Sequence, residues 1–248
     1  MVLASALDIF SRSGFSYLSR WTHVFVGITW IGLLYFFNFV QVPAYAEMEA
    51  AARNNAIDKL TSRAMWWFRW AAAATLVSGI LLIIFNEQYE NDFIKSPGGV
   101  AIYAGVLLAL AMFLNVWLVI WPSQRKVIAN ARNVQAGGEA DPAVPAAARR
   151  AALASRQNTI FSLPMLIFMV GTSHFPYDSA IDSSGSKRAT FWIIWIVIFA
   201  LFEINALGLV GTSPGGTRII YDSHRNAIIT SFVYAAVAII LFSYILTS

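Results

Sequence analysis

The chain has 248 residues, of which 58% are hydrophobic and only 12% are charged, and its mean hydropathy is +0.62. Soluble chains carry about 25% charged residues, so this composition excludes a water-soluble domain of this size. The sequence has no cysteine, which excludes disulfides, thiolate metal sites, iron–sulfur clusters and covalently attached c-type haem. The formal net charge of +4 does not indicate nucleic-acid binding, because the basic residues lie in loops between apolar segments.

Apolar segments about 20 residues long recur along the chain, which is typical of transmembrane helices rather than of the strands of a membrane β-barrel. We expect spans at residues 21–42, 66–85, 99–121, 159–175, 190–210 and 226–246. The sequence therefore predicts an all-α polytopic membrane bundle with about six transmembrane helices. We divide it into an N-terminal interfacial segment, residues 1–18, and a transmembrane domain, residues 19–248, with a long loop at 122–158.

Lysine and arginine are unequally shared between the two ends of these spans. One side carries twelve of them: Arg53, Lys59, Arg63, Arg69, Arg125, Lys126, Arg132, Arg149, Arg150, Arg156, Arg218 and Arg225. The other side carries five: Arg12, Arg20, Lys95, Lys187 and Arg188. Because basic loops stay in the cytoplasm, we predict that the first group is cytoplasmic and that both termini lie on the outer, periplasmic side.

Two of the three histidines are expected near the outer face. His23 lies one turn inside the first span and His174 at the end of the fourth. Neutral imidazoles from two helices at one depth are suitable axial ligands for the iron of a b-type haem. Gly27, one turn from His23, would let a flat ring approach the backbone, and Trp30 would pack against it. The alternative is that each histidine simply bonds to a loop carbonyl. His224 lies on the opposite side and cannot join them.

A second polar group is predicted in the inner half of the membrane, where Arg69, Asn115 and Glu203 occur at similar depth in three spans. A carboxylate in hydrocarbon is costly unless it is paired, so an Arg69 to Glu203 ion pair is one expectation. A proton relay or a polar substrate pocket is the other.

Copper is a weaker alternative to haem. Met165 and Met169 are one turn apart in the fourth span, and thioether and imidazole ligands suit Cu(I). Methionines at this spacing more often pack between helices, and His174 falls off their face. Nucleotide hydrolysis, dinucleotide binding and common hydrolase chemistry have no motif to support them.

Five runs of sequence resemble the membrane part of bacterial membrane-bound urate oxidases. They are RWTHVFVGITWIGLLYFFNFVQVP (20–43), WWFRWAAAATLVSG (66–79), NVWLVIWPSQRKVI (115–128), NTIFSLPMLIFMVGTSHFP (158–176) and, more weakly, HRNAIIT (224–230). The resemblance implies a multi-pass protein of the bacterial inner membrane. It also implies urate oxidation, with electrons passed to a C-terminal cytochrome c domain. Because these residues include no such domain, we expect either a separate cytochrome in its place or another role for the chain.

The first span also resembles the first helix of copper-resistance D proteins and of membrane protoporphyrinogen oxidases, through His23, Gly27, Trp30 and Gly32. The resemblance to the second group implies haem at His23.

Three functions remain open on the sequence alone. The first is a haem b electron-transfer protein that passes electrons to an external cytochrome c or a quinone-linked partner, without an identifiable catalytic residue, so that an enzyme activity is undecided. The second is a non-enzymatic accessory subunit of a larger respiratory, photosynthetic or oxygenase complex, in which glycine and alanine faces pack against other membrane subunits. The third is a transporter built on Arg69, Asn115 and Glu203.

Overall fold

The computed structural model describes residues 8–175, 184–207 and 215–247, and these parts are helical with short connections. The first long helix consists of α1 (Arg12–Tyr35), the π-helical η1 (Phe36–Gln41) and α2 (Val42–Glu47). The second consists of α3 (Ala50–Ala56), the π-helical η2 (Ile57–Thr61) and α4 (Ser62–Phe85). A short α5 (Asn91–Lys95) precedes the third, formed by α6 (Pro97–Leu114), the π-helical η3 (Asn115–Ile120) and α7 (Trp121–Gln135). Then follow α8 (Val144–His174), α9 (Gly185–Ala206), the 3-10 helix η4 (Gly216–Tyr221) and α10 (His224–Thr247).

The N-terminal part that we expected to lie at the interface continues directly into the first span. Ser11 caps α1, since its Oγ accepts a hydrogen bond from the Gly14 N–H at 3.1 Å. This cap satisfies one of the free donors at a helix start. Residues 12–18 are therefore the first turns of α1, whereas residues 1–7 of the expected segment lie outside the described residues.

Two of the π-helical stretches end two residues before a proline. Pro43 is the second residue of α2, directly after η1, and Pro122 is the second residue of α7, directly after η3. A proline inside a helix lacks an N–H and its ring clashes with the carbonyl four residues earlier. The wider π-helical turn moves that carbonyl away, so each helix continues past its proline to the end of the bundle.

Five helices in the described part are long and apolar enough to cross a membrane. They run over Arg12–Glu47, Ala50–Phe85, Pro97–Gln135, Gly185–Ala206 and His224–Leu246. The prediction of an all-α, multi-pass bundle is thus confirmed, while the end of the expected fifth span, residues 208–210, lies outside the described residues.

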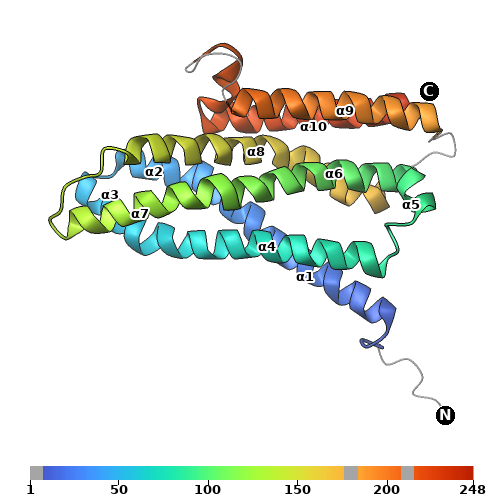
Figure 1. The fold of residues 1–248 in the computed structure, drawn as a ribbon, viewed down its shortest axis with the longest axis horizontal. Helices are drawn as coiled ribbons and strands as arrows, with labels where there is room; N and C mark the ends of the chain where they lie inside the picture. Colours follow the sequence, from blue (N-terminus) through green and yellow to red (C-terminus); the bar gives the residue numbers. More distant parts are fainter. Residues whose placement is uncertain (1–7, 176–183, 208–214, 248) are drawn as a thin grey trace.

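The expected fourth span lies in α8, which is not among these five. Its buried residues include four polar ones, Gln157, Asn158, Thr159 and Ser162, each at most 1% exposed, beside apolar ones such as Phe161 and Phe168. Nevertheless α8 runs alongside α6 and α10 over much of their length (Figure 1). It is therefore a central helix that the other helices cover.

The hydrophobic core is built around α8. Phe168 is fully buried, with its ring centroid 5.2 Å from that of Trp195 in α9 and 5.7 Å from that of Phe242 in α10. On the other side, a Cβ at Gly105 of α6 would lie 3.2 Å from the Phe168 Cβ. Because small residues let membrane helices approach closely, Gly105 sets the α6–α8 spacing.

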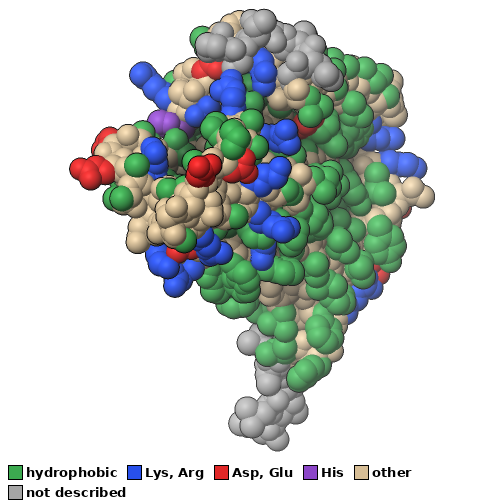
Figure 2. All heavy atoms as spheres, turned by 60° about the vertical axis from the view of Figure 1, so that its left-hand side comes forward, with side chains coloured by type: hydrophobic (Ala, Val, Ile, Leu, Met, Phe, Trp, Pro, Cys, Tyr) green, Lys and Arg blue, Asp and Glu red, His purple; other side chains and the backbone are tan. Residues whose placement is uncertain are grey.

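Lysine and arginine gather at one end of the bundle. Figure 2 shows them over the end formed by α3, α7 and the connection after α7, with hydrophobic side chains over much of the remaining surface of that view. In our prediction from charge, this end faces the cytoplasm.

Candidate functional site

His23 is held by a neighbouring helix. Its Nδ1 lies 3.0 Å from the Thr75 carbonyl oxygen and 3.2 Å from the Ser78 Oγ, both in α4. A carbonyl can only accept, so Nδ1 carries the hydrogen and, in the neutral ring, Nε2 keeps its lone pair. A Cβ at Gly79 would lie 3.1 Å from the His23 Cε1, so this glycine lets the imidazole rest against α4.

His174 is held by its own helix at the other candidate position. Its Nδ1 lies 3.1 Å from the Val170 carbonyl oxygen, one turn earlier in α8, and the side chain is exposed. As in His23, Nε2 is the nitrogen left free to bind a metal. Ligating histidines usually donate their other ring N–H in this way, which fixes the orientation of the ring.

The structure places the two histidines in the same half of the bundle but not opposite each other. His23 is level with Thr75, ten residues before α4 ends at Phe85. His174 is the last residue of α8, whose Thr172 Oγ1 donates to the Gly98 carbonyl at the start of α6. At 1.5 Å per residue, His23 is about 15 Å further from that end. The similar depth that we expected is therefore not observed, because helix ends in a sequence do not show how α1 crosses α4.

The two residues expected beside the haem differ in their surroundings. A Cβ at Gly27 would meet nothing within 4 Å, so the backbone there is open to a flat group. Trp30 is only 2% exposed, and its indole N–H has no hydrogen-bond partner among the described residues. His224 lies at the start of α10, with its ring 6.1 Å from that of Phe39, at the opposite end from His174 (Figure 1).

The expected inner cluster is divided among three contacts. The Arg69 guanidinium carbon lies 3.7 Å from the centroid of the Trp121 ring. The Asn115 Nδ2 donates to the Asn158 Oδ1 at 2.9 Å, and the Gln157 Nε2 donates to the Glu203 Oε1 at 3.1 Å. No Arg69 to Glu203 ion pair forms among the described residues. The reason is that α8 supplies the partners of both Asn115 and Glu203.

A polar network that the sequence reasoning missed joins α8 to η4. The Tyr221 hydroxyl donates to the Gln157 Oε1 at 2.5 Å, and the Arg156 Nη1 donates to the Tyr221 carbonyl at 2.6 Å. Burial, and then the nearby Glu203 carboxylate, raises the pKa of Tyr221 well above its ordinary value. The signal in the sequence was the adjacent pair Gln157 and Asn158 at the start of an apolar run, which a count of charged residues overlooks.

The methionines of the copper hypothesis pack against α6. The Met169 Cγ and the Met165 carbonyl lie 3.5 and 3.3 Å from a Cβ built at Gly105. No group of three or more His, Asp or Glu side chains suited to a metal occurs in the described residues.

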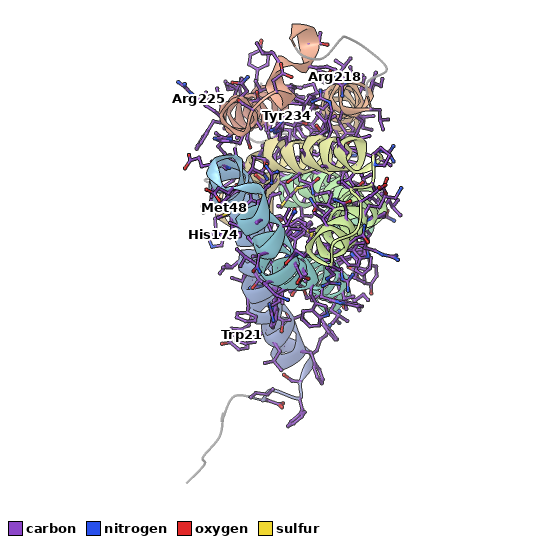
Figure 3. All side chains as sticks on the ribbon, turned by 90° about the vertical axis from the view of Figure 1, so that its left-hand side faces the viewer. Trp21, Met48, His174, Arg218, Arg225 and Tyr234 are labelled. Atoms are coloured by element: carbon purple, nitrogen blue, oxygen red, sulfur yellow. The ribbon has the colours of Figure 1, made fainter. Side chains whose placement is uncertain are left out.

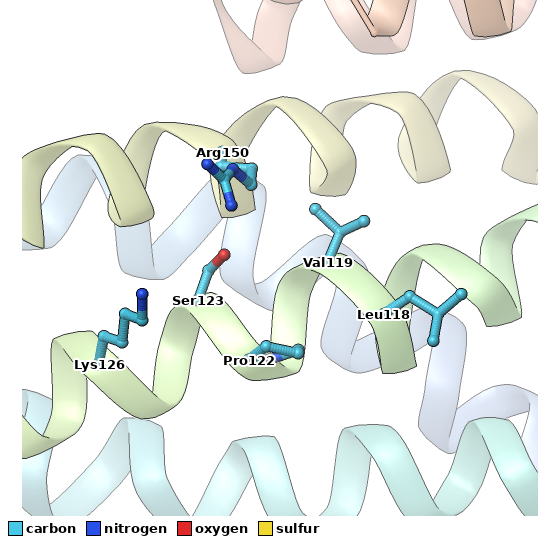
Figure 4. A pocket seen from close by; sticks show the side chains of 6 residues that line it. All are labelled: Leu118, Val119, Pro122, Ser123, Lys126 and Arg150. Atoms are coloured by element: carbon cyan, nitrogen blue, oxygen red, sulfur yellow. The ribbon is translucent and has the colours of Figure 1, made fainter.

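Two hollows lie at the basic end, away from His174. The smaller, of about 70 Å³, is lined from α7 and α8 by residues that include Ser123, Lys126 and Arg150 (Figure 4). The larger, of about 400 Å³, lies between α4 and α7.

These features define a multi-pass helical membrane protein whose central helix, α8, contributes several of the buried polar side chains. Residues 87–206, from the connection after α4 to the end of α9, match the family described as urate oxidase N-terminal. This part of the chain is thus similar to the family to which the sequence resemblance pointed. The match includes His174, Asn115 and Glu203, whereas His23 and Arg69 lie before it. No curated protein and no solved structure matches the chain.

Proposed function

We propose that the chain is a membrane electron-transfer protein of the urate oxidase type that would hold a b-type haem, with His23 as a residue that would bind its iron. The observation that carries the proposal is the hydrogen bond from His23 Nδ1 to the Thr75 carbonyl inside an apolar helix pair. It orients the imidazole and leaves the Nε2 lone pair for iron. The family match supports the urate oxidase relationship.

A bound haem would supply one-electron Fe(III)/Fe(II) chemistry. The residues of the chain would hold and orient the ring: Thr75 fixes the imidazole, Gly27 leaves the backbone open, and the surrounding apolar helices exclude water. Electrons would pass to an external cytochrome c or a quinone-linked partner. Urate as their origin rests on the family description alone, and no residue is assigned as a catalytic base.

His174 is the candidate for a second ligand, although the structure does not bring it opposite His23. Spectra of variants distinguish the role of His23 as an iron ligand from that of His174. The protein is purified from membranes in mild detergent, and its absorbance is recorded oxidised and reduced. We expect a Soret band and a reduced α-band, both lost in His23→Ala and kept in the control His224→Ala.

The spectrum of His174→Ala shows whether the protein supplies two ligands to the haem iron or one. Loss of the bands would show that His174 also holds the iron, and retention would leave His23 as its protein ligand. A wild-type protein without any Soret band, after growth with a haem precursor, would refute the proposal.

An accessory subunit is the second candidate, because α9 has an exposed apolar face that another membrane subunit could cover. Of its side chains, only Phe191 and Trp195 are buried, whereas Ile193 and Leu201 are 64% and 59% exposed. Such a face suits either lipid or another membrane subunit. Native mass measurement after gentle extraction distinguishes them: a stable larger complex supports the subunit role, and a lone chain with haem argues against it.

A further inference from the structure

The larger hollow is a basic and aromatic groove between α4 and α7, here called the α4–α7 groove. Its principal lining residues are Ser62, Trp66 and Arg69 from α4, and Trp121, Arg125 and Arg132 from α7. The groove lies where the apolar stretch of α4 begins, at the end where lysine and arginine gather (Figure 2). Tryptophan at such a position is typical of the boundary between hydrocarbon and headgroups.

The groove has more positive than negative charge. Its three guanidinium groups meet one carboxylate, that of Asp58, whose Oδ1 lies 2.5 Å from the Arg132 Nε. The same carboxylate also pairs with Lys59 at 2.6 Å. Neither Arg69 nor Arg125 has an ion pair in the described part of the chain. An anion would therefore find two uncompensated guanidinium groups in one groove.

Of the arginines that line the groove, Arg69 is the one with a buried N–H donor that lacks a hydrogen-bond acceptor in the described part of the chain. Its Nε is buried and makes no hydrogen bond within the described residues, while its guanidinium carbon stacks 3.7 Å from the Trp121 ring centroid. The ring contact holds the planar group in place without satisfying its N–H donors. A phosphate oxygen would satisfy them, because guanidinium donors match phosphate geometry.

Apolar side chains continue from the groove toward the middle of the membrane. Trp66 and Trp70 are 48% and 47% exposed on α4, and Leu118, one turn before Trp121, is 69% exposed. The Trp70 ring packs edge-on against Trp117 of η3 at 5.4 Å, so this surface bridges the two helices. Acyl chains would lie along it, whereas a free anion would leave it uncovered.

We propose that the α4–α7 groove binds the phosphodiester headgroup of an anionic phospholipid. Arg69 and Arg125 contact the phosphate, Trp66 and Trp121 pack beside the glycerol region, and the acyl chains follow the exposed surface toward Leu118. Basic pockets between membrane helices are known to hold anionic headgroups. In our orientation this lipid belongs to the cytoplasmic leaflet.

The test uses the full chain in detergent micelles, titrated with phosphatidylglycerol or phosphatidylcholine and followed by native mass spectrometry. We expect phosphatidylglycerol to bind at least tenfold more tightly than phosphatidylcholine. The Arg69→Gln/Arg125→Gln variant should lose about 25-fold of that affinity, from about fivefold for each basic residue at an anionic membrane surface. Equal binding of the two lipids would overturn the proposal.

The matched control removes two exposed arginines from the same end of the bundle, Arg53 in α3 and Arg225 near the start of α10; Figure 3 labels Arg225. Arg53→Gln/Arg225→Gln has the same net charge as the groove variant and should bind within twofold of wild type. An equal loss in both variants would show a diffuse charge effect and refute a defined site.

Two further measurements keep the test decisive. Arg125 is exposed, so Arg125→Gln alone should fold and still weaken phosphatidylglycerol about fivefold if the double variant is unstable. Inorganic phosphate at millimolar concentration should not displace the lipid. Displacement by phosphate would identify a site for a free anion and overturn the lipid assignment.

Discussion

Truncation of Phe168 is the sharpest test of the core described above. Its side chain is fully buried in protein: the ring lies against those of Phe175, Phe191, Trp195 and Phe242, and Gly105 of α6 lies against its Cβ. In a bilayer, the unfolded reference keeps its helices in lipid, so removal of an apolar ring loses little transfer free energy. What is lost is packing.

The size of the effect follows from the cavity left by Phe168→Ala. A cavity of roughly 100 Å³ at about 24 cal/mol per Å³ costs about 2.4 kcal/mol of unfolding free energy. The matched control is Phe232→Ala in α10, whose side chain is 64% exposed and faces away from the core. We expect a change within about 0.5 kcal/mol for this surface position.

Reversible unfolding in mixed micelles, with increasing denaturing detergent, measures both variants under identical conditions. If Phe168→Ala and Phe232→Ala lose the same stability, α8 is not the centre of the packing and the reasoning fails. Phe168→Leu, which fills more of the space, should fall between Phe168→Ala and wild type.

Two other predictions concern the polar groups of α8. A double-mutant cycle of Asn115→Ala and Asn158→Ala, measured by the same unfolding assay, should give a coupling of about 0.6 kcal/mol, the average for hydrogen bonds between membrane helices; a coupling of zero would show that the amides do not meet. The pKa of Tyr221 is raised, so its hydroxyl stays neutral in the folded state, whereas an unfolded tyrosine ionises at a pH of about 10. The contribution of Tyr221 to the free energy of unfolding is therefore fully present below that pH and falls above it. Tyr221→Phe should flatten this fall between about pH 10 and 11, and an unchanged slope would contradict the burial of the hydroxyl.

The sequence predicts where the helices lie along the chain better than it predicts which side of each helix packs in the interior. Composition and run length identified the apolar spans because the hydrocarbon core imposes a fixed length on each. The same reasoning predicted a span at residues 159–175 but did not predict that the longer helix α8 lies at the centre of the bundle, because its buried amides, such as Asn158, come before that apolar run.

The candidate site shows the same limit. His23 is an intramembrane imidazole, and the structure gives it a defined partner in Thr75. The prediction that His23 and His174 hold one haem assumed that both lie at the same depth in the membrane. That depth depends on the angle at which the helices cross, and the sequence of a single span does not determine this angle. Likewise Arg69 was assigned to Glu203 by charge alone, yet an aromatic ring, that of Trp121, is its observed neighbour.

The polar character of α8 has a consequence for how the protein is made. A segment with three arginines at its start and buried amides in its first half has weak affinity for lipid on its own, whereas α6 and α10 are apolar enough to enter independently. Integration of α8 therefore depends on helices already in the bilayer, and α10, which is synthesised after it, completes its enclosure. Until the ribosome has released α10, the amides and hydroxyls of α8 stay exposed in the nascent chain. This is the stage at which a membrane insertase or a quality-control protease would act on the chain.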